Sequence, residues 1–278
     1  MEVLTTIAET RAARASLSSS IGFVPTMGFL HEGHLSLVRA ARAADDHVFV
    51  SIFVNPTQFG PNEDFSAYPR NPESDLALLR DLGADYVFMP SPEEMYPEGF
   101  ASSVDVGPVA EPLEGDFRPG HFRGVATVVL KLFNIVQPHR AYFGRKDAQQ
   151  LVVIRTMVRD LDVPVEIVAA PTIREPDGLA LSSRNTYLSP EQRQAATILS
   201  QALSLAEEMW TRGVRDAEAV RSRLRELIEA EELAQIDYVS VADPETLQEL
   251  ERIHGRALVS MAVRIGRTRL IDNVILGE

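Results

Sequence analysis

IGFVPTMGFLHEGHLSLVRAARAADDHVFVSIFV, residues 21–54, is the stretch that decides the fold of this chain. It opens with an apolar run at 21–25, continues with helical spacing in EGHLSLVRAARAA, and closes with a second apolar run at 47–54. Two short apolar strands joined by a helix of this length predict parallel pairing through a right-handed crossover. The segment therefore predicts a parallel sheet with helices packed on it.

The alternation of strand and helix patterns continues to about residue 172. The further elements that we expect are a helix at 72–82, a strand at 85–89, a helix at 122–136, a strand at 140–144, a helix at 147–160 and a strand at 164–170. This order is typical of a doubly wound, Rossmann-like α/β domain. Such domains bind ligands at the carboxyl ends of their strands, so the loops that follow strands form the candidate site.

A segment rich in Pro, Gly and Ser, PTIREPDGLALSSRNTYLSPEQ (171–192), interrupts the alternation and predicts a long ordered loop. Beyond it we expect helices at about 190–212 and 216–230, and then strands at 236–242, 257–265 and 268–276. Helices followed by a run of strands predict a smaller α+β domain. The chain should therefore form two domains, residues 1–172 and residues 173–278.

The composition of the 278-residue chain excludes several classes of function. Without cysteine there is no disulfide, no thiolate metal site and no cysteine nucleophile, which fits a reducing compartment. The net charge of -13 argues against broad binding to nucleic acid or to an anionic membrane. The N-terminal MEVLTTIAETRAARASL lacks the apolar run of a signal peptide or membrane helix, so we expect a cytoplasmic location.

The segment TMGFLHEGH (26–34) leaves the first strand and enters a helix. Gly28 allows a tight turn and a close approach of the backbone to a ligand. His31 and His34 stand three residues apart at the positive end of the helix dipole, an arrangement suited to a polyphosphate. The alternatives are two surface histidines, or a zinc pair around Glu32. The zinc-protease motif, however, needs histidines four residues apart and further ligands.

Amides and arginines follow in two further loops. In FVNPTQFGPNEDFSAYPR (53–70), Asn55 and Gln58 could hydrogen-bond the hydroxyls or carboxylate of a small acid without adding charge, although a simple turn also explains them. In EGDFRPGHFRGVATVV (114–129), Arg118 lies on a Gly- and Pro-rich stretch that could close over a site, or could be a solvated basic loop.

Two more donor-rich segments lie at a strand end and in the long loop. FGRKDAQQ (143–150) brings a positive charge at Lys146 and an acceptor at Asp147, with Gln150 one turn further on. LALSSRN (179–185) offers hydroxyls, backbone amides and a guanidinium that could surround a triphosphate. The alternatives are a capped helix with a solvated lysine for FGRKDAQQ and an ordinary Ser-rich turn for LALSSRN. Because most of these segments lie after strands or at helix starts, together they predict an ATP site beside a small polar acid.

Five motifs together resemble one known family. PTMGFLHEGH, FVNPTQF, GHFRGVATVV, FGRKDAQQ and LSSRN occur in this order over about residues 20–190, as in the pantothenate synthetases, the pantoate-beta-alanine ligases of the HIGH-type nucleotidylyltransferase superfamily. HEGH resembles the HIGH signature of that superfamily, and LSSRN resembles its KMSKS loop. The resemblance implies that pantoate and ATP give pantoyl-adenylate and pyrophosphate, and that beta-alanine then gives pantothenate and AMP.

The resemblance also implies roles for single residues. The catalytic residues would be His31, His34, Lys146 and Arg184. The ATP-binding residues would be Thr26, Met27, Gly28, His31, His34, Gly144, Lys146, Asp147, Leu181, Ser182, Ser183 and Arg184. The pantoate-binding residues would be Asn55, Gln58, Gln150 and Arg118, the last on a mobile loop.

The family further implies partners and an assembly. Mg2+ accompanies ATP in such enzymes, and Asp75 is the candidate carboxylate near it. The resemblance implies a homodimer formed through residues 1–172, which bind ATP and pantoate, with residues 173–278 covering the active site.

Two positions depart from the family. Arg145 stands where Glu is common and changes the local charge, whereas Leu181 stands where Met is common and keeps an apolar contact.

Two other functions remain open on the sequence. Another HIGH-type adenylyltransferase would transfer AMP to a phosphate ester, but the uncharged Asn55 and Gln58 and the second domain argue against it. A non-catalytic nucleotide-binding module would not need His31, His34 and Lys146 directed at a leaving group. The sequence therefore favours an ATP-dependent acid-amine ligase with small-molecule substrates and no nucleic acid or membrane partner.

Overall fold

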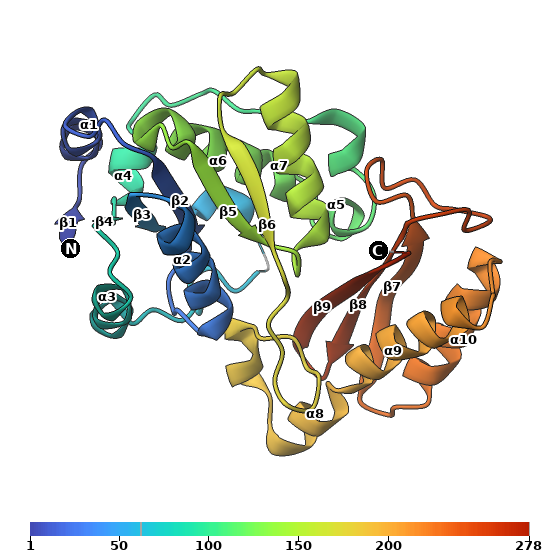
Figure 1. Cartoon of the computed structure of the whole chain (residues 1–278). Coiled ribbons are helices and arrows are strands. Elements are labelled where there is room, and N and C mark those ends of the chain that lie inside the picture. Colours follow the sequence, from blue (N-terminus) through green and yellow to red (C-terminus); the bar gives the residue numbers. More distant parts are fainter. Residues whose placement is uncertain (62, 278) are drawn as a thin grey trace. The chain divides into compact units, whose positions relative to one another are not determined.

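The computed structural model describes residues 1–61 and 63–277 of the chain. The chain folds as two compact units, one made of Met1–Arg145 and Val153–Pro171 and the other of Lys146–Val152 and Thr172–Glu278 (Figure 1). The short segment Lys146–Val152 therefore belongs with the C-terminal residues rather than with the strand that precedes it.

The first unit is built on a six-stranded parallel sheet in the order β1-β4-β3-β2-β5-β6. Its strands are β1 (Glu2–Leu4), β2 (Ile21–Thr26), β3 (His47–Ile52), β4 (Tyr86–Phe88), β5 (Arg140–Gly144) and β6 (Glu166–Ala170). Because β3 and β4 lie on one side of β2 and β5 and β6 on the other, the strand order reverses between β2 and β5. The predicted doubly wound sheet is confirmed. The edge strand β1, which pairs with β4, was not predicted.

Helices cover both faces of this sheet. They are α1 (Ile7–Ala15), α2 (Glu32–Ala44), α3 (Pro72–Asp81), α4 (Pro92–Met95), α5 (Glu114–Phe117), α6 (His121–Val136) and α7 (Ala148–Asp160), with 3-10 turns η1 (Pro56–Gln58) and η2 (Gly107–Ala110). Alternate residues of β2 point to opposite faces. Val24 packs in one buried cluster with Val38 of α2, whereas Phe23 packs edge-on against Phe133 of α6, with ring centroids 6.4 Å apart.

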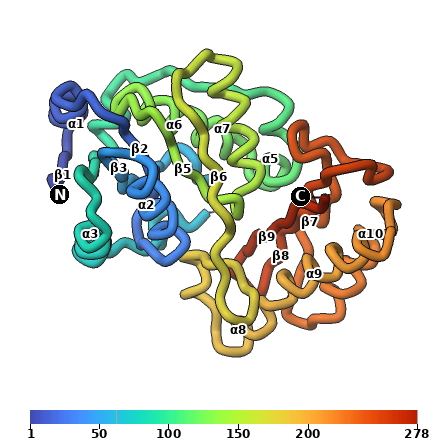
Figure 2. The backbone as a smooth tube through the Cα atoms, in the orientation of Figure 1, coloured from blue at the N-terminus to red at the C-terminus, as the bar shows by residue number. Residues whose placement is uncertain are grey.

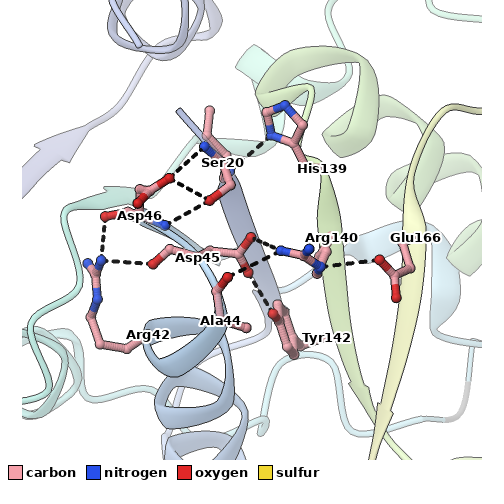
Figure 3. A network of polar contacts seen from close by, with 10 residues as sticks. Ser20, Arg42, Ala44, Asp45, Asp46, His139, Arg140, Tyr142 and Glu166 are labelled. Atoms are coloured by element: carbon pink, nitrogen blue, oxygen red, sulfur yellow. Dashed lines mark hydrogen bonds and ion pairs between the residues drawn. The ribbon is translucent and has the colours of Figure 1, made fainter. Parts of the chain in front are cut away.

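A network of polar contacts closes the amino ends of the central strands (Figure 3). Asp45, which is 5% exposed, accepts hydrogen bonds from Arg140 Nη1 at 2.7 Å and from the Tyr142 hydroxyl at 2.6 Å. Burial and the Asp45 carboxylate raise the pKa of Tyr142, so its hydroxyl remains a donor. Gly22 is needed beside them, because a Cβ there would lie 2.6 Å from Asp45 Oδ2. The protein therefore satisfies its own polar groups at this edge of the sheet.

The second unit contains a three-stranded antiparallel sheet in the order β7-β8-β9. Its elements are η3 (Ser183–Tyr187), α8 (Pro190–Ala195), α9 (Ile198–Thr211), α10 (Ala217–Glu229), β7 (Ala234–Ala242), β8 (Ala257–Ile265) and β9 (Thr268–Leu276) (Figure 2). Val241 and Val259 share a buried cluster with Leu203 of α9 and Leu224 of α10, so these helices cover one face of the sheet. The predicted α+β arrangement is confirmed, although the helix expected at 190–212 is two helices.

No helix in the described part of the chain combines the length and the apolar character needed to cross a membrane.

Candidate active site

The loop after β2 is held by its own residues and by the next strand. Thr26 Oγ1 donates to the carbonyl oxygen of Ser51 at 2.8 Å and accepts from the backbone amide of Gly28 at 3.2 Å. Gly28 has a φ of 84°, and a Cβ there would lie 3.0 Å from Ile52 Cγ2. Glycine is therefore required at the point where the chain leaves the carboxyl end of β2.

Asp75 of α3 fixes the next turn of the same loop. Its side chain is buried, with the residue 2% exposed, and its two carboxylate oxygens accept hydrogen bonds from the backbone amides of Phe29 at 2.8 Å and Leu30 at 2.7 Å. Phe29 has a φ of 51°, a conformation that a bulky residue adopts only when its surroundings impose it. Asp75 thus holds a strained turn directly before α2.

His31 and His34 begin helix α2. His31 is the N-cap residue, and its Nδ1 accepts a hydrogen bond from the backbone amide of Gly33 at 3.2 Å. The Nδ1 of His34 accepts from the backbone amide of His31 at 3.4 Å, and the two rings lie 4.1 Å apart between centroids. Because each Nδ1 accepts, the proton of each neutral ring is on Nε2. The helix start therefore presents two ring N–H donors at the positive end of its dipole.

Asn55 is the N-cap of the turn η1 after β3, and Gln58 is the last residue of that turn. Asn55 is 1% exposed, and its Nδ2 donates to Gln58 Oε1 at 3.0 Å and to the carbonyl oxygen of Gly124 at 3.2 Å. Its Oδ1 accepts from Thr57 Oγ1 at 3.0 Å and from the Tyr96 hydroxyl at 2.7 Å. Protein groups thus occupy both ends of the Asn55 amide, which orients Gln58.

Arg118 lies in a polar cluster of the first unit. Its Nε and Nη2 donate to the carboxylate of Glu63 at 2.9 and 2.7 Å, and its Nη1 lies 3.0 Å from His121 Nε2. The side chain of Arg118 is 16% exposed, and that of Glu114, 3.8 Å away, is 7% exposed. In this structure the guanidinium of Arg118 is directed at the carboxylates of Glu63 and Glu114.

His121 joins this cluster to η1. Its Nδ1 donates to the carbonyl oxygen of Gln58 at 2.8 Å, and its Nε2 accepts from Arg118. Burial, followed by the positive charge of Arg118, lowers the pKa of His121 from 6.5 to about 4. The ring is therefore neutral at physiological pH, with its proton on Nδ1.

An apolar cavity of about 250 Å³ opens beside Met27. Its walls include Ile52 and Phe53 at the end of β3 and Met89 and Pro90 after β4. The sulfur of Met27 also accepts a hydrogen bond from Gln58 Nε2 at 3.2 Å. Met27 thus connects the amide of Gln58 to an apolar space at the carboxyl edge of the sheet.

The second unit holds the remaining candidate residues in two segments. Lys146, Asp147 and Gln150 lie at the start of α7, where the carbonyl oxygen of Asp147 accepts from the amide of Leu151 at 3.0 Å. In the other segment, Ser182 is the N-cap of η3, and its Oγ accepts from the backbone amide of Arg184 at 3.2 Å. Leu181 precedes this turn, and Ser183 within it is buried. Gly144 is the last residue of β5 and belongs to the first unit.

The family model of pantoate-beta-alanine ligases matches residues 2–275. The chain belongs to the pantoate-beta-alanine ligase family. Curated relatives called pantothenate synthetase include those of Roseiflexus castenholzii, 63% identical over 276 residues and covering 99% of each chain, and of Herpetosiphon aurantiacus, 62% identical over 277 residues and covering 99% of this chain and 100% of the relative. The predicted family and the predicted ligase class are confirmed.

Solved structures of the pantoate-beta-alanine ligase family share the whole fold. Pantothenate synthetase from Thermus thermophilus matches with a TM-score of 0.94 and 51% identity, covering 99% of both chains. The ligase from Francisella tularensis, complexed with beta-gamma ATP and beta-alanine, matches with a TM-score of 0.82 and 37% identity, covering 99% of this chain and 97% of the other.

The described residues show no cluster of side chains for the magnesium ion that the family implies. Among residues 1–61 and 63–277, no group of three or more His, Asp or Glu side chains is placed to hold a metal ion. Both oxygens of the candidate ligand Asp75 accept backbone hydrogen bonds, and the residue is 2% exposed. These contacts fit a residue that holds a loop and do not fit a magnesium ligand.

Several residues near the candidate site were not selected from the sequence. His121 lies within the quoted motif GHFRGVATVV, but the motif does not show that its ring contacts Gln58. Tyr96 and Asn273, in contrast, lie in segments without a recognisable motif. Their contacts with Asn55 and Lys146 depend on tertiary structure alone.

Proposed function

We propose that this protein condenses pantoate with beta-alanine through a pantoyl-adenylate. A carboxylate oxygen of pantoate attacks the α-phosphorus of ATP, and the bond from that phosphorus to pyrophosphate breaks. The amine of beta-alanine then attacks the acyl carbon, loses a proton, and displaces AMP to give the amide. The observation that carries this proposal is the pair of histidines, His31 and His34, at the start of α2, in a chain that matches the ligase family over residues 2–275.

His31 and His34 act on the charge that grows on the leaving pyrophosphate. Phosphoryl transfer depends mainly on positioning and on donors directed at the developing charge. The two Nε2–H groups at the start of α2 are such donors, because both Nδ1 atoms accept backbone hydrogen bonds. Gly28 has a positive φ and no side chain, so the nucleotide can approach the backbone of this turn.

Gln58 binds the acid, and Asn55 orients it. The Gln58 amide already has a defined direction, since its oxygen accepts from Asn55 and its nitrogen donates to Met27. An uncharged amide can contact pantoate without repelling its carboxylate or neutralising its nucleophilic oxygen. The apolar cavity beside Met27 offers space for the dimethyl carbon of pantoate. Arg118 supports this region through His121.

Residues of the second unit are also part of the proposal for ATP. We assign Lys146, Ser182, Ser183 and Arg184 to the phosphates, because ammonium, guanidinium and hydroxyl donors complement their charge. Asp147, together with Gly144 and Leu181, contacts the nucleoside, and Gln150 contacts pantoate. This proposal follows the family motifs FGRKDAQQ and LSSRN.

The wider setting of the reaction is also part of the proposal. Mg2+ would be held mainly by phosphate oxygens and water, and would neutralise part of the charge of the triphosphate. The enzyme works in the cytoplasm as a homodimer formed through residues 1–172. The lack of cysteine in the chain supports a reducing compartment.

Exchange of labelled pyrophosphate into ATP tests the function. Formation of an acyl-adenylate is reversible, so the label should enter ATP only when pantoate is present. Exchange without pantoate would indicate a different adenylyltransferase. No exchange by folded protein, with both ATP and pantoate supplied, would indicate a non-catalytic nucleotide-binding protein.

A further inference from the structure

Two adjacent residues of β9 each contact a segment that carries ATP-directed residues. Asn273 Nδ2 donates a hydrogen bond of 2.7 Å to the carbonyl oxygen of Lys146. The carboxylate of Asp272 accepts from Arg174 Nη1 at 2.6 Å and from Arg174 Nη2 at 2.9 Å. All four residues belong to the second unit.

Arg174 lies at the base of a hairpin that leads into LSSRN (181–185). Arg174 and Ala180 form an antiparallel bridge, and the amide of Leu181 donates to the carbonyl oxygen of Ile173 at 3.0 Å. Arg174 Nη1 also donates to the carbonyl oxygen of Gly178, which turns the hairpin with a φ of 91°. A contact that fixes the guanidinium of Arg174 therefore also fixes the position of Leu181, the first residue of LSSRN.

Asp272 and Asn273 are buried and point to opposite faces of the sheet. Asp272 pairs with Met261, whose side chain joins the core formed with α9 and α10, and Asn273 pairs with Ser260 on the other face. The residues Asp272 and Asn273 are 2% and 9% exposed. A buried carboxylate needs its partner, so the bidentate pair with Arg174 is strongly constrained in geometry.

We propose that Asp272 and Asn273 are positioning residues that fix Lys146 and LSSRN (181–185) relative to one another for adenylate formation. Neither residue touches ATP in this proposal. They act through the backbone of Lys146 and through the hairpin of Arg174. The inference rests on the proposed function, because it assumes that both segments act on one triphosphate. Donors to a reacting phosphate must be placed within a fraction of an ångström, so small displacements of either segment reduce the rate.

The same sheet offers a matched control. Ser260 is 6% exposed, and in the described residues its hydroxyl has no hydrogen-bond partner. It is the register partner of Asn273. The substitution Ser260→Ala therefore changes a buried polar group beside Asn273 without removing a contact to Lys146, and should leave both activity and stability close to those of the wild type.

The decisive variants are Asn273→Leu and Asn273→Asp. Both remove the amide donor to the carbonyl oxygen of Lys146, the first by an apolar side chain and the second by a carboxylate. We expect both to lower the kcat of pantoate-dependent pyrophosphate exchange by about tenfold to a hundredfold, with the melting temperature and the KM for pantoate near those of Ser260→Ala. Arg174→Lys, which keeps the charge but loses the two-pronged contact with Asp272, should behave in the same way.

A double-mutant cycle separates positioning from a general structural role. If Asn273 acts through Lys146, then Asn273→Leu should have little further effect on the residual exchange of Lys146→Ala. An equal reduction in both backgrounds would overturn the proposal. Wild-type exchange by Asn273→Leu, or a loss of exchange that merely follows a lower melting temperature, would also overturn it.

Titration calorimetry with ATP keeps this test separate from that of the function. It does not require pantoate, and we expect Asn273→Leu to weaken ATP binding while Ser260→Ala does not. A wild-type protein that binds ATP but shows no pantoate-dependent exchange would contradict the proposed function. Equal ATP affinity of wild type and Asn273→Leu would contradict the positioning role.

Discussion

His121 Nδ1 donates a hydrogen bond of 2.8 Å to the backbone carbonyl of Gln58. The other ring nitrogen of His121 accepts from Arg118, so the ring is neutral and its tautomer is fixed. This contact ties the first turn of α6 to η1, the turn that carries Gln58. The orientation of a proposed substrate-binding amide therefore depends on an imidazole that must stay unprotonated.

The stability of the protein should fall as the pH decreases from 6.5 toward 4. The pKa of His121 is lowered from 6.5 to about 4 by folding, so in this range the unfolded chain binds the proton first. The loss should approach roughly 3 kcal/mol and level off below the folded pKa. Urea unfolding at several pH values would measure it. The control is His121→Asn, which keeps a hydrogen-bond donor but cannot titrate. An equal fall in the unfolding free energy of that variant between pH 6.5 and pH 4 would contradict the prediction.

Gly124→Ala should disturb the acid-binding side of the site. A Cβ at residue 124 would lie 2.3 Å from the carbonyl oxygen of Thr57 and 2.7 Å from the amide of Gln58. Because both contacts are with backbone, η1 must move, at a cost of about 1–3 kcal/mol in the free energy of unfolding. We expect a higher KM for pantoate and an unchanged KM for ATP in pyrophosphate exchange. Gly255→Ala is the control, since a Cβ there meets no described atom within 4 Å.

Asp75→Asn distinguishes a loop-holding carboxylate from a magnesium ligand. The variant replaces one acceptor by an amide donor, which cannot accept from Phe29 or Leu30. The expected cost is about 1–3 kcal/mol in unfolding free energy, with a lower rate of exchange. The Mg2+ concentration that half-saturates the exchange should not change. A clearly higher requirement for Mg2+ would make Asp75 a ligand after all.

Lys146→Ala should reduce adenylate formation by orders of magnitude while the protein stays folded. The proposed role of the ammonium is to stabilise charge on the phosphates, which the alanine methyl cannot do. The sequence supplies a matched control, because Lys131 is the only other lysine of the chain. Its Nζ lies 4.6 Å from the ring centroid of Phe100, so Lys131→Ala should cost a little stability and leave exchange intact. Near-normal turnover by Lys146→Ala would remove this residue from the proposed mechanism.

Local patterns predicted most of the fold. The apolar strands β2, β3, β5 and β6 and the amphipathic α2 have lengths and periodicities that depend on neighbouring residues only. The strand β1 is three residues long, too short for a periodic pattern. The helix expected at 190–212 is interrupted between Ala195 and Ile198, although each half has helical spacing. Sequence periodicity does not detect such a break.

The candidate site was predicted less completely, because partners far apart in the chain decide what a side chain can do. The histidines of α2 are set by local capping, and the structure places them at the helix start as expected. In contrast, Arg118 pairs with Glu63, which lies 55 residues away, and Asp75 binds a loop 45 residues before it. A motif indicated Arg118 and the family resemblance indicated Asp75, but only the fold supplied the partner of each.

The hydrogen bond between Asn273 and Lys146 also has a consequence for the newly made chain. These residues are 127 positions apart, and synthesis at ordinary rates needs on the order of ten seconds to cover that distance. For most of this interval, once residue 185 has been added, a nascent chain carries Lys146 and LSSRN but lacks the strand that is proposed to fix them. On the positioning role proposed for β9, adenylate formation by a ribosome-bound chain stays slow until this strand has been synthesised.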